Sequence, residues 1–136
     1  MNDHELLARL IKCEAGGEGD TGMRAVATVV MNRVQTRDGE YGRYNTPSDV
    51  VYATNQFECV SHPTQNIYNI APEDHHYEIA EWAINGGRLG AVGEALWFFN
   101  PYSDVCPDRF PSSVGYFYNR IGDHCFYAPT SRYYQT

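Results

Sequence analysis

The 136-residue sequence is short of basic residues and contains no long apolar run. Its 10 lysines and arginines are outnumbered by 17 aspartates and glutamates, which gives a formal net charge of -7. Such a surface repels nucleic acids and anionic lipids, so no nucleic-acid partner is expected. No segment reaches the ~20 apolar residues that a membrane span needs, and the N-terminus lacks a signal-peptide pattern. We therefore expect no membrane insertion and synthesis in the cytosol.

Several familiar catalytic signatures are also missing. The sequence has no G-x-S-x-G, no H-E-x-x-H and no P-loop, so it predicts no cofactor. It also lacks a C-x-x-C pair, and its cysteines are widely spaced at Cys13, Cys59, Cys106 and Cys125. Free buried thiols are the expected state, with a Cys106–Cys125 disulfide as the alternative if the aromatic segments around them pair.

Two other arrangements of the cysteines remain open at this stage. Cys59-x-x-His62 and His124-Cys125 together offer zinc ligands, and one of the first two cysteines with either histidine offers a Cys–His nucleophile. Neither spacing matches a standard motif, so we predict no metal site.

The chain length suits one domain covering residues 1–136. Apolar residues at helical spacing predict four helices, over residues 3–15, from a cap at Asp20 or Thr21 to about Val34, and over 47–52 and 73–85. Aromatic segments with strand character follow at residues 95–99, 114–119 and 125–127. The sequence therefore predicts an α+β fold, mainly α, in which a small β element is appended to a helical body.

Glu14 is the most informative residue, because it lies at the end of an apolar helical stripe. Leu7, Leu10, Ile11 and Glu14 are spaced i, i+3, i+4 and i+7, so the acid shares the buried face of the first helix. A carboxylate held against apolar surface loses hydration in its charged form, and its pKa is expected to rise toward the range of a proton donor. The alternative is a glutamate that fraying of the helix end exposes to solvent.

A protonated carboxylic acid is what glycoside cleavage requires beside the scissile oxygen. Candidates for a second carboxylate are Glu18 and Glu58. The expected role of Glu18 is instead to cap the second helix, whereas Glu58 is equally suited to bonding backbone amides. If neither acts, one acid suffices, because the 6-hydroxyl of a muramic sugar can close on its own anomeric carbon.

Aromatic and polar side chains in the second half of the chain are candidates for sugar binding. Rings that could stack on pyranose faces are Trp97, Phe98, Phe99, Tyr102, Tyr116 and Tyr118, although Trp97 and Phe98 are expected in the core. The default expectation for His75-His76 and for Asn32-Arg33 is solvated surface, with Asn32 bracing a loop as the alternative. His124 is expected to be a hydrogen-bonded structural residue with a binding role left open.

Taken together, these segments resemble the spore cortex-lytic cell-wall hydrolases. The residues that carry the likeness are Cys13-Glu14-Ala15-Gly16-Gly17-Glu18-Gly19, Gly22-Met23, Asn32-Arg33, Gln56-Phe57-Glu58, Trp97-Phe98-Phe99-Asn100-Pro101 and His124-Cys125-Phe126-Tyr127-Ala128-Pro129. The CwlJ-like branch is the most similar, and SleB-type catalytic domains are more distant.

The resemblance implies a lysozyme-like, transglycosylase-related fold that binds peptidoglycan glycan strands in a cleft, with Glu14 as the catalytic glutamate. It places Gln56, Phe57 and Glu58 along the groove. The substrate-binding residues predicted in all are Glu18, Gln56, Phe57, Glu58, Phe99, Asn100, Tyr102 and His124. It also implies action at the spore coat and cortex, with a spore-coat partner protein, or on a host cell wall for a phage-derived relative.

The leading hypothesis is cleavage of the β-1,4 bond between N-acetylmuramic acid, or its lactam, and N-acetylglucosamine, by a lytic transglycosylase using Glu14 as acid and base. Hydrolysis of the same bond by a phage-type muramidase is one alternative. A non-catalytic glycan-binding or coat-structural module is another.

Overall fold

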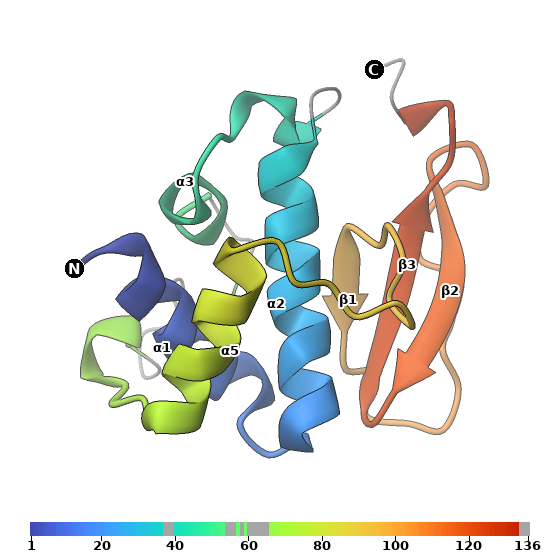
Figure 1. Cartoon of the computed structure of the whole chain (residues 1–136). Coiled ribbons are helices and arrows are strands. Elements are labelled where there is room, and N and C mark those ends of the chain that lie inside the picture. The colour runs from blue at the N-terminus through green and yellow to red at the C-terminus, as the bar shows by residue number, and fades with distance from the viewer. Residues whose placement is uncertain (37–39, 54–56, 58, 60–65, 134–136) are drawn as a thin grey trace.

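The computed structural model describes residues 1–36, 40–53, 57, 59 and 66–133. Helices occupy the first part of the chain and strands the last part (Figure 1). The elements are α1 (Asp3–Ala15), α2 (Gly19–Gln35), the 3-10 turn η1 (Glu40–Arg43), α3 (Pro47–Val51), the 3-10 turn η2 (Ile67–Asn69), α5 (Asp74–Ile84), β1 (Trp97–Phe99), β2 (Gly115–Ile121) and β3 (His124–Pro129). The predicted mainly helical α+β architecture is confirmed.

Helix α1 forms where the sequence predicts it. The Asn2 side chain accepts a hydrogen bond from the backbone N–H of Glu5 at 2.8 Å, which caps the first turn. Leu7, Leu10 and Ile11 are fully buried, so the apolar stripe faces the core. The helix continues through Ala15, and the Gly16 N–H donates to the Lys12 carbonyl at its end. Fraying before Glu14 is therefore ruled out.

Helix α2 begins at Gly19, slightly earlier than the expected cap at Asp20 or Thr21. Gly19 has φ +77°, a left-handed conformation that glycine adopts without strain and that allows a sharp connection from α1. Asp20 does not cap the helix but pairs with Arg24 at 2.7 Å, one turn further on.

Helix α2 is the centre of the molecule, with the other helices on one side and the sheet on the other (Figure 1). One of its faces joins the helical core through Val26 and Val30. The other packs Ala25 and Val29 against Phe126 of β3. Two apolar faces on one helix explain why most of the α2 side chains are buried.

The shorter helices follow their local capping signals. α3 starts at Pro47, and Thr46 and Asp49 form a reciprocal capping box around that start. α5 starts at Asp74, within one residue of the prediction, and its N-cap is Glu73. None of the helices within the described residues is long and apolar enough to cross a membrane.

The three strands form an antiparallel sheet in the order β1-β3-β2. Trp97 pairs with Tyr127 on one side of β3, and Gly115 pairs with Pro129 on the other. A bulge between Phe117 and Asn119 shifts the register of β2. β3 is buried along almost its whole length, so it forms the central strand on which the residues near its start are positioned.

Candidate active site

A cavity of about 670 Å³ lies between the end of α1, the start of α2 and the sheet. Its lining comes from segments far apart in the sequence. The lining residues are Lys12, Cys13, Glu14, Ala15, Gly16, Gly17, Glu18, Arg33, Phe57, Cys59, Phe98, Phe99, Asn100, Tyr102, Arg109, Asp123 and His124. The volume is in the range typical of sites for small molecules or for a few residues of a polymer.

Glu14 reaches this cavity from the last turn of α1 and is half-buried. One of its carboxylate oxygens, Oε1, lies 3.5 Å from Sγ of Cys59. Because Leu10 and Ile11 fill the core one turn earlier on the same face, the helix holds the acid at the boundary between core and cavity. This is the placement that the i, i+3, i+4, i+7 spacing predicts.

Glu18 does not cap α2 with its side chain but bridges to the turn between β2 and β3. Its Oε1 accepts a hydrogen bond from the backbone N–H of Asp123 at 3.1 Å and lies 3.2 Å from Nδ1 of His124. The Glu18 and His124 side chains are only 14% and 8% exposed. The expected capping role of Glu18 is therefore wrong: the carboxylate ties the helical body to the sheet at the cavity.

His124 is held between charge and aromatic surface. Burial lowers its pKa below the ordinary histidine value, and the negative charges of Glu18 and Asp123 act in the opposite direction. The Phe98 ring meets the imidazole edge-on, with centroids 5.3 Å apart. His124 faces the cavity, but its Nδ1 has no hydrogen-bond partner among the described residues despite the nearby Glu18 carboxylate, so the expected hydrogen-bonded setting is not found.

All four cysteines are in disulfides, Cys13–Cys59 and Cys106–Cys125, so the expectation of free thiols is wrong. The alternative Cys106–Cys125 bridge is present because β1 and β2 both pair with β3 and bring the connecting loop over it. The zinc and Cys–His nucleophile arrangements both need a thiolate, and a disulfide sulfur cannot supply one. No local pattern indicated the Cys13–Cys59 pairing, which joins residues 46 positions apart.

Asn32 and Arg33 are not the surface residues that were expected. The Asn32 side-chain amide donates to the carbonyls of Gly93 and Ala95 at 3.1 and 2.9 Å, which is the loop-bracing alternative. Arg33 is buried at 3% exposure, and its Nε donates to the Leu96 carbonyl at 2.6 Å. Charge is tolerated there because the guanidinium also lies over an aromatic ring, with its carbon 4.6 Å from the centroid of Tyr41.

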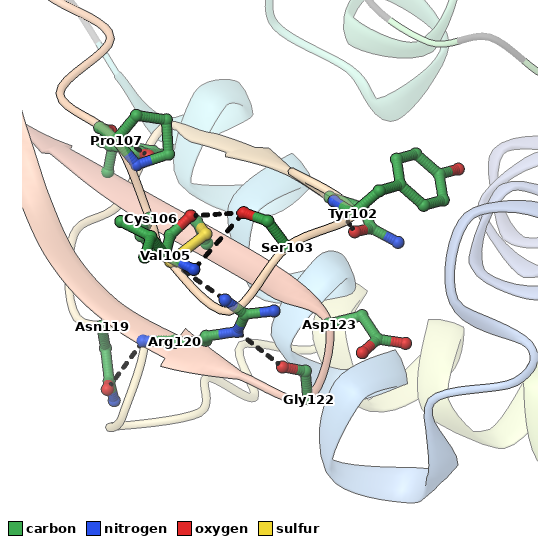
Figure 2. The surroundings of a disulfide bond; sticks show 12 residues. Tyr102, Ser103, Val105, Cys106, Pro107, Asn119, Arg120, Gly122 and Asp123 are labelled. Carbon is green, nitrogen blue, oxygen red and sulfur yellow. Dashed lines mark hydrogen bonds between the residues drawn. A yellow bond between two sulfur atoms is a disulfide. The ribbon is translucent and has the colours of Figure 1, made fainter.

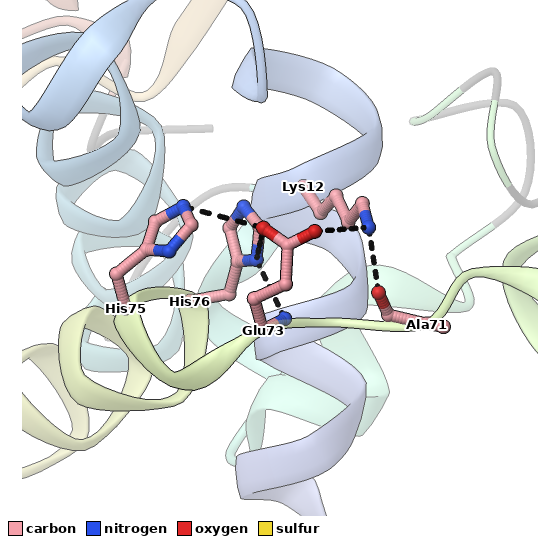
Figure 3. A network of polar contacts seen from close by, with 5 residues as sticks. All are labelled: Lys12, Ala71, Glu73, His75 and His76. Atoms are coloured by element: carbon pink, nitrogen blue, oxygen red, sulfur yellow. Dashed lines mark hydrogen bonds and ion pairs between the residues drawn. The ribbon is translucent and has the colours of Figure 1, made fainter.

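A polar network beside the cavity fixes Lys12 (Figure 3). The Lys12 ammonium donates to the Ala71 carbonyl at 2.6 Å and to Glu73 Oε1 at 3.3 Å. The hydrogen bond and positive charge of Lys12 lower the pKa of Glu73. His76 is buried, contrary to the expected surface position, because its Nδ1 accepts the Glu73 N–H and so caps α5. His75 remains exposed.

The same network includes a group with the composition of a metal site. Donor atoms of Glu73, His75 and His76 lie within 4.8 Å of one another, the one such group among the described residues. However, Glu73 is paired with Lys12, and His76 Nδ1 is occupied by the helix cap. These contacts account for the cluster as part of the α5 N-terminus.

Aromatic residues from β1 and the connection after it contribute to the lining of the cavity. Phe98 and Phe99 line the cavity from β1, and the Arg109 guanidinium lies over the Phe99 ring at 3.9 Å. Tyr102 is 89% exposed and has φ +52°, an uncommon conformation for a non-glycine residue. Its N–H donates to Oδ1 of Asn100 at 2.7 Å, which holds the turn that displays the ring.

The structure brings most of the predicted site residues into one cavity. Those that line it are Glu14, Glu18, Phe57, Phe99, Asn100, Tyr102 and His124. Gln56 and Glu58 lie outside the described residues. Of the other aromatic candidates, Trp97 packs against Phe110, with centroids 4.4 Å apart, whereas Tyr116 and Tyr118 are exposed on β2; none of the three lines the cavity.

Sequence reasoning missed several cavity residues. Lys12, Arg109 and Asp123 gave no periodic signal, since two of them lie in connections between strands. Asn32-Arg33 is one of the segments that resemble the cell-wall hydrolases, and this resemblance was the one available sign that Arg33 is not an ordinary surface residue.

Known proteins similar to this chain share one family and one fold. The family model described as Cell Wall Hydrolase matches residues 17–127. The cell wall hydrolase CwlJ of Bacillus subtilis (strain 168) is 33% identical over 129 residues, covering 95% of this chain and 87% of that protein. A spore cortex-lytic enzyme of Bacillus cereus is 34% identical over 101 residues, covering 74% of this chain but only 36% of the relative.

The catalytic domain of the germination-specific lytic transglycosylase SleB from Bacillus anthracis is similar in structure. It matches with a TM-score of 0.69 and 30% identity, covering 93% of both chains. The predicted lysozyme-like, transglycosylase-related fold is thereby confirmed. With a family model that spans most of the sequence and relatives aligned over nearly all of it, the chain belongs to the cell wall hydrolase family.

Proposed function

We propose that this cell wall hydrolase cleaves peptidoglycan glycan strands at the β-1,4 bond between N-acetylmuramic acid, or its lactam, and N-acetylglucosamine, with Glu14 as acid and base. Membership of the family supports an enzyme that acts on peptidoglycan. The observation that carries the finer proposal is the half-buried Glu14 carboxyl at the boundary of core and cavity.

The first step requires a proton on the leaving oxygen. In this mechanism the protonated Glu14 gives its proton to the glycosidic oxygen as the bond to the muramic C1 breaks, and N-acetylglucosamine leaves with a free 4-hydroxyl. Positive charge develops on the muramic ring. Phe57 and Phe98 line the cavity, and their rings exclude water from the part of the cavity that they cover.

The second step returns the enzyme to its starting state. The Glu14 carboxylate accepts the proton of the muramic 6-hydroxyl, whose oxygen bonds to C1 and closes a 1,6-anhydro ring. No water is consumed. The SleB domain that is similar to this chain is described as a lytic transglycosylase. This similarity supports closure of the anhydro ring over hydrolysis.

A single-acid mechanism is also supported by what Glu18 does. Its carboxylate accepts the Asp123 N–H and lies beside His124, so it is engaged in holding the cavity together. Asp123 is the other described carboxylate that lines the cavity, and it is exposed. If Asp123 positions a water, hydrolysis of the same bond results, and this is the second candidate reaction.

We further propose that Glu18, Phe99, Asn100, Tyr102 and His124 bind the glycan, together with Gln56, Phe57 and Glu58. The exposed Tyr102 ring offers a face for stacking on a sugar. Relatives named as a spore cortex-lytic enzyme and a germination-specific transglycosylase support action on the spore cortex. We also propose a single catalytic domain over residues 1–136 and a spore-coat partner protein.

The products of digestion test the proposal. Purified protein is incubated with peptidoglycan, and the soluble fragments are separated and weighed by mass spectrometry. Anhydro-muramic ends support transglycosylation, whereas reducing ends heavier by one water indicate hydrolysis. Binding to sacculi without soluble fragments would overturn the enzymatic proposal in favour of a binding module.

A further inference from the structure

In each disulfide, one cysteine is adjacent in sequence to a residue that lines the cavity. Cys13 immediately precedes Glu14, and Cys125 immediately follows His124. Their partners, Cys59 and Cys106, belong to two different segments that contribute cavity residues. Both covalent links therefore fix distances across the site as well as within the fold.

The Cys13–Cys59 bridge lies directly against the proposed acid. Both cysteines line the cavity, and Cys59 is only 1% exposed. Its Sγ is 3.5 Å from Glu14 Oε1. A disulfide sulfur carries no hydrogen, so it shields this oxygen from water without donating to it. A reduced thiol at the same place would donate an S–H to the carboxylate and favour the charged form of Glu14.

The Cys106–Cys125 bridge attaches the connection between β1 and β2, which contributes cavity residues, to the start of β3 (Figure 2). The connection from β1 to β2 carries Tyr102 and Arg109, and Cys106 lies between them. Around the bridge, Arg120 reaches Cys106 Sγ at 3.9 Å and donates from Nε to the Gly122 carbonyl at 3.1 Å. The Tyr127 hydroxyl adds a 2.6 Å hydrogen bond to the Pro107 carbonyl.

We propose that the two disulfides are positioning elements with separable roles: Cys13–Cys59 sets the turnover of Glu14, Cys106–Cys125 sets the binding of the glycan, and the enzyme works in its oxidised form. The assignment of turnover rests on the proposed function. Reduction by a dithiol passes two electrons and two protons to each bridge, leaving two thiols on the protein and a disulfide on the reductant.

A purely stabilising role predicts something different. Cross-links that close loops constrain the unfolded chain, so loss of either bridge would lower the melting temperature. In the fraction that stays folded, however, KM, kcat and the pH profile would all remain those of the wild type. The kinetic parameters therefore separate positioning from stabilisation.

The experiment compares two double variants, Cys13→Ala/Cys59→Ala and Cys106→Ala/Cys125→Ala. Kinetics are measured on soluble glycan strands well below the melting temperature, with rates corrected for the folded fraction from circular dichroism. The first variant is expected to lose about tenfold in kcat with KM within twofold. The second is expected to raise KM about fivefold with kcat within twofold.

A third variant isolates the hydrogen bond to Glu14. Cys13→Ala/Cys59→Ser restores a donor at position 59, so the alkaline limb of its kcat profile should move to lower pH than in the alanine pair. If any variant fails to fold, wild-type enzyme with and without dithiothreitol tests the combined loss of both bridges, which should lower kcat and raise KM together. Unchanged KM, kcat and pH profile in the folded fraction, despite a lower melting temperature, would overturn the proposal.

The two proposals fail in distinguishable ways. If wild-type enzyme releases no glycan fragments, the proposed function fails. The role of the Cys106–Cys125 bridge is then tested by binding, and its alanine pair should have a higher dissociation constant for sacculi than the wild type. If wild-type enzyme is active and both alanine pairs match it, only the positioning role fails.

Discussion

Replacement of Gly122 by alanine tests the bridge between the helical body and the sheet. Gly122 forms the turn between β2 and β3 with φ +58°. A Cβ there would lie 2.8 Å from Glu18 Oε2, closer than such atoms approach in proteins. The carboxylate can move away, because it ends a flexible side chain, but it then leaves Asp123 and His124.

The cost of Gly122→Ala follows from these contacts. A left-handed backbone costs alanine about 1 kcal/mol more than glycine. Loss of the charged hydrogen bond from the Asp123 N–H to Glu18 adds about 2 kcal/mol. The sum of about 3 kcal/mol corresponds to a fall of about 10 °C in melting temperature for a chain of this length.

The assay is thermal unfolding of the oxidised protein, with two controls. Gly19 also has positive φ, +77°, but nothing lies within 4 Å of a Cβ placed there. Gly19→Ala should therefore lower the free energy of unfolding only by the backbone cost of about 1 kcal/mol. In a Glu18→Ala background, Gly122→Ala should likewise cost about 1 kcal/mol. Equal penalties for Gly122→Ala with and without Glu18 would refute the bridge.

Four further predictions concern single side chains. Glu18→Gln removes a charge that raises the pKa of His124, so that pKa should fall further in NMR titration; an unchanged value would contradict the pairing. Because burial lowers the pKa of His76 and His124, the unfolded chain takes up protons first, and the free energy of unfolding should fall as pH drops below about 6.5. Urea unfolding across pH 5 to 8 checks this, and His76→Gln should flatten the slope. Tyr102→Asn, which tolerates the same backbone, should raise KM about fivefold without changing the melting temperature; an unchanged KM would exclude stacking. Arg33→Lys loses the planar group over Tyr41 and should lower the free energy of unfolding by about 2 kcal/mol in urea titration, and no loss would exclude the stacked geometry.

Local patterns in the sequence predicted the parts of the fold that depend on neighbours along the chain. The cap at Asn2, the stripe through Ile11 and the proline start of α3 each act within one or two turns, so periodicity and capping residues revealed them. The placement of Glu14 followed for the same reason. The short aromatic strands were also found, because β-prone residues cluster there between turn signals.

The remaining features depend on partners distant in sequence. Glu18 contacts a turn 105 residues away, and no local pattern encodes that distance. The Cys13–Cys59 bridge needs the packing of the intervening helices before its two cysteines meet. The buried position of Arg33 likewise requires the Leu96 carbonyl and the Tyr41 ring, which the tertiary fold supplies.

In the proposed mechanism, Glu14 supplies the proton for glycan cleavage. Glu14→Gln keeps the shape of the side chain and removes the acid, so kcat should fall by about 10²- to 10⁴-fold, while binding to sacculi and the melting temperature stay near wild type. Glu78→Gln, on the exposed side of α5, is the matched control and should retain full activity. The decisive measurement is the rate of soluble fragment release from peptidoglycan by these two variants. A Glu14→Gln rate within twofold of wild type would show that Glu14 is not the proton donor.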